Sequence, residues 1–117
     1  MQDNGSIPIW LQISEMIRIR IIAGKIPAGE KLPSVREIAV TERANPNTVQ
    51  KALAVLEDEG LIFTDRTNGK FVTYDTAKID AEKSRYAKRL ASEYLSAAAA
   101  VGFSAEDAVS LIREEMK

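Results

Sequence analysis

The stretch NPNTVQKALAVLEDEGLI, residues 45–62, predicts a helix whose two sides serve different purposes. Apolar residues recur in it at helical spacing, and we expect them to face a core: Val49, Ala52, Leu53 and Leu56. Amide, hydroxyl and ammonium groups crowd the exposed side of its first turn and a half, at Asn47, Thr48, Gln50 and Lys51. Packing explains the apolar stripe but leaves the polar tip without a role.

Two start signals place this helix directly behind a shorter one. Asn45 supplies an N-cap side chain, Pro46 supplies a ring whose missing N–H costs nothing at the first helical position, and Gly60 ends the helix. Upstream, Ser34 with Glu37 three residues later matches a capping box and predicts a short helix that ends near residue 40 or 41. Together they form a predicted helix-turn-helix pair.

The flanking segments complete a winged domain. Residues 9–23 carry an isoleucine at every fourth position, which predicts an amphipathic helix. Beyond the helical pair, LIFTD and KFVTY are β-rich runs on either side of RTNG, and Asn68-Gly69 is a strong hairpin signal because both residues tolerate positive φ. We therefore predict a winged helix-turn-helix domain over residues 7–75.

Residues 76–117 have the pattern of a helical tail. A seam with steps of seven, four, four, three and four residues predicts a long helix: Ile79, Tyr86, Leu90, Tyr94, Ala97 and Val101. Gly102 breaks this helix, and Ser104 with Asp107 starts a last one. The predicted fold is therefore mainly α with a small β-hairpin wing (α+β), a winged helix-turn-helix followed by a two-helix C-terminal tail.

The apolar seam of the tail needs a partner surface. A winged helix of about 70 residues has limited surface with which to cover two more helices. We therefore expect the tail to dimerise, with these interface residues: Tyr86, Leu90, Tyr94 and Val101. The alternative is that the tail folds back on its own domain, because a helix generally hides one face.

Composition excludes several classes of protein. The 117 residues are 45% hydrophobic and 28% charged, which is typical of a globular chain. With no histidine and no cysteine, the commonest metal ligands, the usual proton shuttle and the thiol nucleophile are missing, so we expect neither an enzyme nor a cofactor. No apolar run approaches the roughly 20 residues of a membrane span, and residues 1–10 lack a secretory signal pattern. These features favour the cytoplasm and no membrane partner.

Charge is unevenly distributed, although the net charge is only -1. Residues 31–51 carry four basic side chains against two acidic ones, whereas residues 52–65 hold four acidic side chains and no basic one. We expect the acidic run Glu57-Asp58-Glu59 to be a solvated face near a helix end, without a catalytic role. Any nucleic-acid surface must therefore be a small patch.

The polar helix tip suits the major groove of DNA, where base pairs differ in the donors and acceptors on their edges. Asn47 and Gln50 carry amides that pair with adenine, and Thr48 offers a methyl group to thymine or a hydroxyl to a phosphate. Lys51 is long enough to reach guanine or a phosphate. Side chains on the preceding helix and at the two helix starts are expected to reach the same groove or its phosphates: Arg36, Ser34 and Asn45. For any one of these residues, ordinary surface polarity is the alternative.

The predicted wing has two interpretations. In the first, Gly69 lets the backbone approach DNA closely while Arg66 and Lys70 neutralise phosphates, with entry into the minor groove. In the second, RTNGK is polar only because turns are polar.

AGEKLPSVREIAV, NPNTVQKALAVLEDEGLI and a wing ending in NGKFV together resemble the GntR superfamily of bacterial winged-helix regulators. The match covers residues 7–74, and the two-helix tail resembles that of the YtrA subfamily. The resemblance implies that DNA is contacted by Arg36, by the wing at Gly69 and by the start of the third helix: Asn45, Asn47, Thr48, Gln50 and Lys51. It also implies that the tail dimerises in place of the large ligand-binding domain of longer subfamilies, whose members are often repressors of transporter operons.

The chain departs from the pattern of that family in two places, the turn and the wing. Glu42 and Arg43 stand where the family usually has an apolar residue and a glycine, and a non-glycine residue at positive φ would be strained. The wing of the family usually has two glycines separated by one residue. The wing of this chain has one glycine, Gly69, with Asn68 as the nearest substitute for the other.

The expected function is sequence-specific DNA binding by a transcriptional regulator. One recognition helix reads too few base pairs to select a site in a genome, so we expect a homodimeric repressor on a palindromic operator of double-stranded DNA. The alternative is a winged-helix module that contacts another protein through its third helix, which fits the net charge of -1. A small-molecule effector is left open, because no cluster of residues identifies one.

Overall fold

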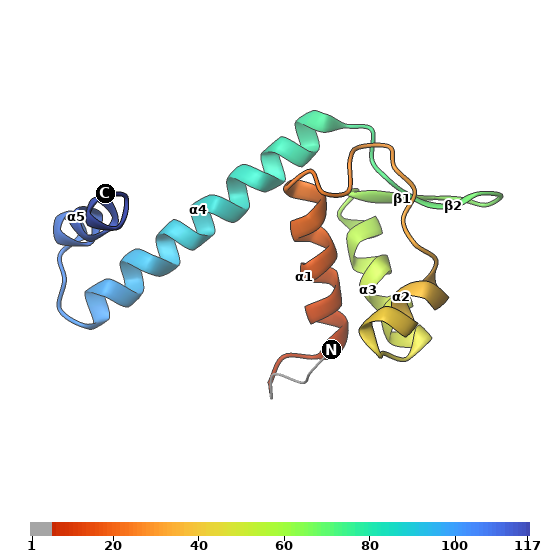
Figure 1. The fold of residues 1–117 in the computed structure, drawn as a ribbon, viewed down its shortest axis with the longest axis horizontal. Coiled ribbons are helices and arrows are strands. Elements are labelled where there is room, and N and C mark those ends of the chain that lie inside the picture. Colours follow the sequence, from red (N-terminus) through yellow and green to blue (C-terminus); the bar gives the residue numbers. More distant parts are fainter. Residues whose placement is uncertain (1–5) are drawn as a thin grey trace. The chain divides into compact units, whose positions relative to one another are not determined.

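The computed structural model describes residues 6–117, and Figure 1 shows the course of the chain. Its elements follow in this order: α1 (Ile9–Ile22), α2 (Val35–Glu42), α3 (Pro46–Asp58), β1 (Ile62–Asp65), β2 (Gly69–Val72), α4 (Thr76–Ala100) and α5 (Ala105–Glu115). The predicted mainly α fold with a hairpin wing is confirmed. Residues 1–5, half of the segment searched for a signal sequence, lie outside the described residues.

The chain divides into two compact units, the first ending at Ala81 and the second spanning Glu82–Lys117. The division falls inside α4, a few residues beyond the start of that helix. The boundary between the domains predicted from the sequence, residues 7–75 and 76–117, falls at the start of α4 instead. These domains stay a prediction.

The core of the first unit forms around α3, which packs against α1, α2 and β1. The stripe predicted from the sequence is buried in full: Val49, Ala52, Leu53 and Leu56. The isoleucine repeat of α1 supplies the opposing surface through Ile13, Ile17 and Ile21, all at most 3% exposed. These side chains leave the first turns of α3 projecting from the core on their polar side.

The wing is a hairpin in which β1 and β2 pair antiparallel, with Ile62 opposite Val72 and Asp65 opposite Gly69. Its loop is residues 66–68, so Gly69 is the first residue of β2 and takes a φ of +106°. Asn68 has no positive φ, although its sequence would tolerate one. The reason is Asp65, whose side chain accepts hydrogen bonds from the backbone N–H groups of Thr67 and Asn68 at 2.9 and 3.1 Å and folds the loop.

The turn between α2 and α3 is left-handed at Arg43, with φ 53° and ψ 46°. In residues 6–117 this is the one non-glycine residue at positive φ. The Ala44 N–H donates to the Ala39 carbonyl at 2.9 Å, so the helix ends as it would with a glycine at position 43. The departure from the family pattern therefore preserves the turn at the cost of backbone strain.

The acidic run at the end of α3 is not simply a solvated face. Glu59 accepts hydrogen bonds from Arg18 of α1 at 2.7, 2.9 and 3.1 Å, and the Arg18 side chain is only 16% exposed. Glu57 accepts a hydrogen bond from Thr64 and lies 3.4 Å from the Lys70 ammonium, both in the wing. The run lies at the end of the helix and stays largely exposed, as predicted, but the partners of Glu57 and Glu59 were not predicted, because they lie 7 to 41 positions away in the chain.

The second unit contains the remainder of α4 and all of α5. Ser104 caps α5, as predicted, by accepting the Asp107 N–H at 3.1 Å. Tyr94 donates its hydroxyl to the Ala108 carbonyl at 2.6 Å, and Ala98 and Ala108 are buried. The Tyr94 hydroxyl thus ties α4 to α5 through the backbone of the second helix.

We predict that Glu59→Gln lowers the free energy of unfolding by about 1–2 kcal/mol, because Arg18 would lose one of its two carboxylate partners, the one that joins α1 to α3, in a partly buried site. The control is Asp58→Asn, an exposed neighbour, for which we expect a change within about 0.5 kcal/mol. Denaturant unfolding at one fixed protein concentration measures both. Equal effects of the two substitutions would show that the Arg18–Glu59 pair does not hold α1 to α3.

We predict that Arg43→Gly raises the free energy of unfolding by about 0.5–1 kcal/mol. Glycine removes a left-handed penalty of about 1–2 kcal/mol, of which its greater freedom in the unfolded chain cancels part. Arg43→Ala deletes the same charge but keeps Cβ, so it should give no such gain. A gain of the same size from alanine would place the effect in the arginine side chain instead of the backbone.

Candidate nucleic-acid interface

The N-terminal end of α3 presents the polar residues that the sequence places there. The Asn45 side chain caps the helix by accepting the Asn47 backbone N–H at 2.8 Å, and Pro46 follows as its first residue. The side chains of Asn47 and Gln50 are exposed, and Thr48 is half-buried. An amide pair one turn apart therefore stands open at the tip of the helix, where its donors and acceptors can meet another polar surface.

The start of α2 is held by the predicted capping box. Ser34 Oγ accepts the Glu37 N–H at 3.1 Å, and Glu37 Oε1 accepts the Ser34 N–H at 3.0 Å. The hydrogen bond from the Ser34 backbone, and then that with its side chain, lower the pKa of Glu37 below its usual range. The Ser34 hydroxyl can still donate its own hydrogen, and Arg36 is exposed two residues on.

Lys51 is exposed, but its ammonium lies 4.4 Å from the centre of the Trp10 ring in α1. This cation–π contact was not predicted, because nothing in the spacing of residues 10 and 51 indicates that they meet. It holds the lysine against the side of the domain.

The polar residues of the wing differ in exposure and in the number of contacts that they make within the domain. Arg66 and Asn68 are exposed in the loop, with the Asn68 side-chain amide donating to Asp65 at 3.3 Å. The Lys70 ammonium donates to Thr64 Oγ1 at 2.7 Å and faces Glu57. The hydrogen bond from Thr64, followed by the charge of Lys70, lowers the pKa of Glu57. Lys70 is therefore drawn toward the end of α3, and the charge of the wing is concentrated at Arg66.

A groove of about 470 Å³ separates the wing from the segment that leads into α2. It is lined by residues 31–35 on one side and by residues 64–70 on the other. The groove joins Ser34 and Arg66, which were predicted separately. It also contains Lys31, for which the sequence offers no signal of a contact with the wing.

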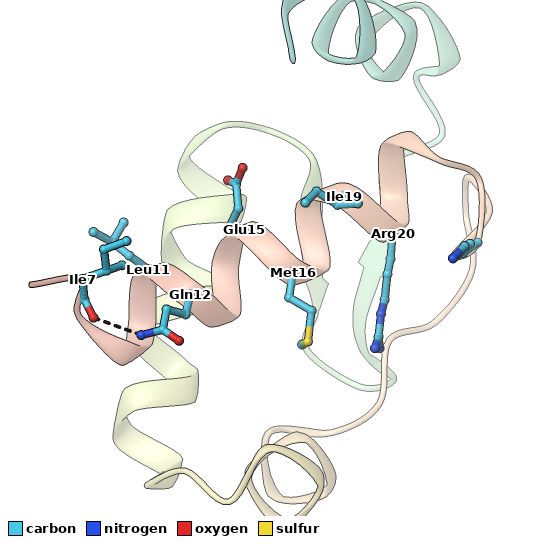
Figure 2. Close-up of a pocket in the computed structure, with 8 residues that line it drawn as sticks. Ile7, Leu11, Gln12, Glu15, Met16, Ile19 and Arg20 are labelled. Carbon is cyan, nitrogen blue, oxygen red and sulfur yellow. Dashed lines mark hydrogen bonds between the residues drawn. The ribbon is translucent and has the colours of Figure 1, made fainter. Parts of the chain in front are cut away.

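A second hollow, of about 540 Å³, runs along the outer side of α1. Figure 2 shows Ile7, Leu11 and Ile19 along it, with Gln12 donating to the Ile7 carbonyl at 3.0 Å. None of the residues that line it belongs to the predicted DNA-contacting set. It is therefore a surface separate from the ends of α2 and α3.

Other kinds of site find no support in the part of the chain that the structure describes. Acidic residues do not gather there into a group of three or more able to hold a metal ion. No single helix of residues 6–117 is long and apolar enough to cross a membrane, although the bent pair of α4 and α5 meets the same test when taken together.

Comparison with known proteins identifies relatives along the whole chain. The model of the gntR family of bacterial regulatory proteins matches residues 10–72. The HTH-type transcriptional regulator YhcF of Bacillus subtilis is 30% identical over 112 residues, which are 96% of this chain and 93% of that protein. The HTH-type transcriptional repressor YtrA of the same organism is 46% identical over 73 residues, covering 62% of this chain and 56% of the repressor.

Solved structures agree with these relatives. A GntR family transcriptional regulator from Listeria monocytogenes superposes with a TM-score of 0.89 at 35% identity, covering 97% of this chain and 98% of its own. The DNA-binding domain of AraR, solved in complex with operator ORX1, matches 62% of this chain and 87% of its own with a TM-score of 0.57 and 28% identity.

Proposed function

Because this chain belongs to the gntR family of bacterial regulatory proteins, we propose that it acts as a homodimeric repressor on a palindromic operator. Like its relatives, it is a DNA-binding transcriptional regulator and not an enzyme. The observation that carries the proposal is the exposed amide pair, Asn47 and Gln50, at the open end of α3.

In this proposal the tip of α3 enters the major groove and reads base edges. Asn47 and Gln50 pair with adenine, and Thr48 contacts thymine or a phosphate. Lys51 first leaves Trp10, which is a small cost because an exposed cation–π contact contributes only about 0.5–1 kcal/mol. A guanine edge or a phosphate then replaces the ring as its partner.

Phosphates are held around that tip by groups on three elements. Ser34 and Asn45 lie at helix starts, where the dipole favours an anion, and Arg36 reaches across from α2. The wing adds its loop and the start of β2: Arg66, Asn68, Gly69 and Lys70. For Lys70 this requires release from Glu57, and a pair whose side chains are 27% and 41% exposed holds it by only about 0–1 kcal/mol.

The tail, residues 76–117, joins two copies so that two such tips meet paired half-sites about one helical turn apart. Leu90 is 48% exposed and Val101 74% exposed, while Tyr86 and Tyr94 are half-buried. A two-fold partner would cover this seam. We further propose that the chain is a member of the YtrA subfamily, that it works in the cytoplasm and that it controls a transporter operon.

We expect Arg36→Ala and Gln50→Ala each to weaken binding by about 1–3 kcal/mol, roughly 5- to 150-fold, on a duplex selected by the wild-type protein. Gln50→Ala should also relax the base preference at one position, because it removes a contact to a base edge. Arg20→Ala, an exposed arginine on α1, is the control and should leave binding unchanged. Fluorescence anisotropy at fixed salt gives all three values. Wild-type affinity in the Arg36 and Gln50 variants would remove the proposed interface.

We expect Leu90→Glu to raise the dimer dissociation constant at least 10-fold, because a carboxylate would be buried against an apolar partner surface. Ser92→Glu places the same charge two residues away, off the seam, and should leave dimerisation intact. Sedimentation equilibrium measures both variants. If the wild-type chain stays monomeric at all concentrations, the tail is not a dimer interface.

A further inference from the structure

Lys31 is fixed on the edge of the wing by its backbone. It pairs with Phe71 of β2 in an antiparallel bridge, and the next residue, Leu32, donates its N–H to the Lys70 carbonyl at 2.9 Å. Leu32 is itself 3% exposed. The segment before α2 therefore acts as a short third strand, and its position relative to the wing is set by packing.

The Lys31 side chain lies along the backbone of Gly69. A Cβ at position 69 would stand 3.2 Å from Lys31 Cε and 3.9 Å from its ammonium nitrogen. Glycine at this position thus serves two needs, a φ of +106° and room for the lysine. The ammonium is held beside the first residue of β2, at the groove between the wing and α2.

The charges around this groove leave two cations available. The Asp65 carboxylate accepts three hydrogen bonds from its own loop, and Lys70 faces Glu57. Lys31 lies near Glu37, whose oxygen is used in the capping box. Neither Lys31 nor Arg66 forms an ion pair with any carboxylate in the described range 6–117. The groove is therefore lined by two exposed cations, Lys31 and Arg66, and by Ser34 at the start of α2, where the helix dipole favours an anion.

We propose that Lys31 and Arg66 grip one phosphate of the operator backbone in this groove, which makes Lys31 a further DNA-contacting residue. The proposal rests on the proposed function. A phosphate of DNA fits better than a free anion, because exposed pairs are weak one at a time. A duplex presents one charge per about 1.7 Å of its axis, and each contact releases condensed counterions.

The test is the salt dependence of binding to a duplex selected by the wild-type protein. Lys31→Gln should reduce the slope of log affinity against log salt by about 0.9 for each half-site, or about 1.8 for a dimer on both. Its preference among base sequences should not change, since a phosphate contact carries no sequence information. Lys25→Gln is the matched control, an exposed lysine outside the groove with the same change of charge, and should keep the wild-type slope.

The outcomes separate the inference from the proposed function. Absence of binding by the wild-type protein would remove the function itself. Wild-type binding with the same slope in Lys31→Gln and Lys25→Gln would overturn only the role of Lys31. Lys31→Arg keeps the charge and should restore the wild-type slope, so a loss there as well would show that residue 31 acts through packing.

A second arm distinguishes the source of the phosphate. Inorganic phosphate is titrated into the free protein while the amide resonance of Gly69 is followed. We expect no saturation up to about 10 mM, since two exposed cations are screened by solvent. Saturable binding that Lys31→Gln abolishes would overturn the assignment to DNA and indicate a site for a free anion.

Discussion

The structure depends on the burial of one side of α3, which holds the helix in the core and leaves its N-terminal end exposed. Its apolar side is fully enclosed at Val49, Leu53 and Leu56, and each such side chain contributes roughly 1.5–3 kcal/mol on burial. Its C-terminal end is then tied to α1 and to the wing by Glu59 and Glu57. Packing is the larger effect and sets the position of the helix, while the carboxylates fix its orientation. Only the N-terminal end remains free to present polar groups to a partner.

The basic surface of the first unit is smaller than its count of lysines and arginines suggests. Lys51 rests on Trp10, Lys70 faces Glu57, and Arg18 is enclosed by Glu15 and Glu59. The cations left around the groove and the start of α2 include Lys31, Arg36 and Arg66. With a net charge of only -1, the protein has no general attraction for a polyanion. Its affinity for DNA must come from this local patch, and so must be sensitive to salt.

Local signals were sufficient to predict most of the fold. The starts of α2, α3 and α5 follow from capping residues within three positions of each other, and the buried stripes follow from periodicity. The bonds of Arg18 with Glu59, of Lys51 with Trp10 and of Lys70 with Glu57 could not be predicted, because each joins elements that only the tertiary fold brings together. The position of Lys31 beside the wing could not be predicted for the same reason, since its bridge to Phe71 has no signature in the sequence. The polar residues predicted at the tip of α3 needed only one helix, and Asn47 and Gln50 are exposed there, while their contacts with DNA stay a prediction.

The central claim is that two copies of α3 read DNA in register, and selection from random duplexes tests it most directly. The full-length protein is incubated with a random library at physiological salt, and the retained sequences are determined. The account predicts an inverted repeat whose half-sites are centred about one helical turn apart. Retained DNA without any shared sequence, or with a single half-site and no symmetry, would contradict it.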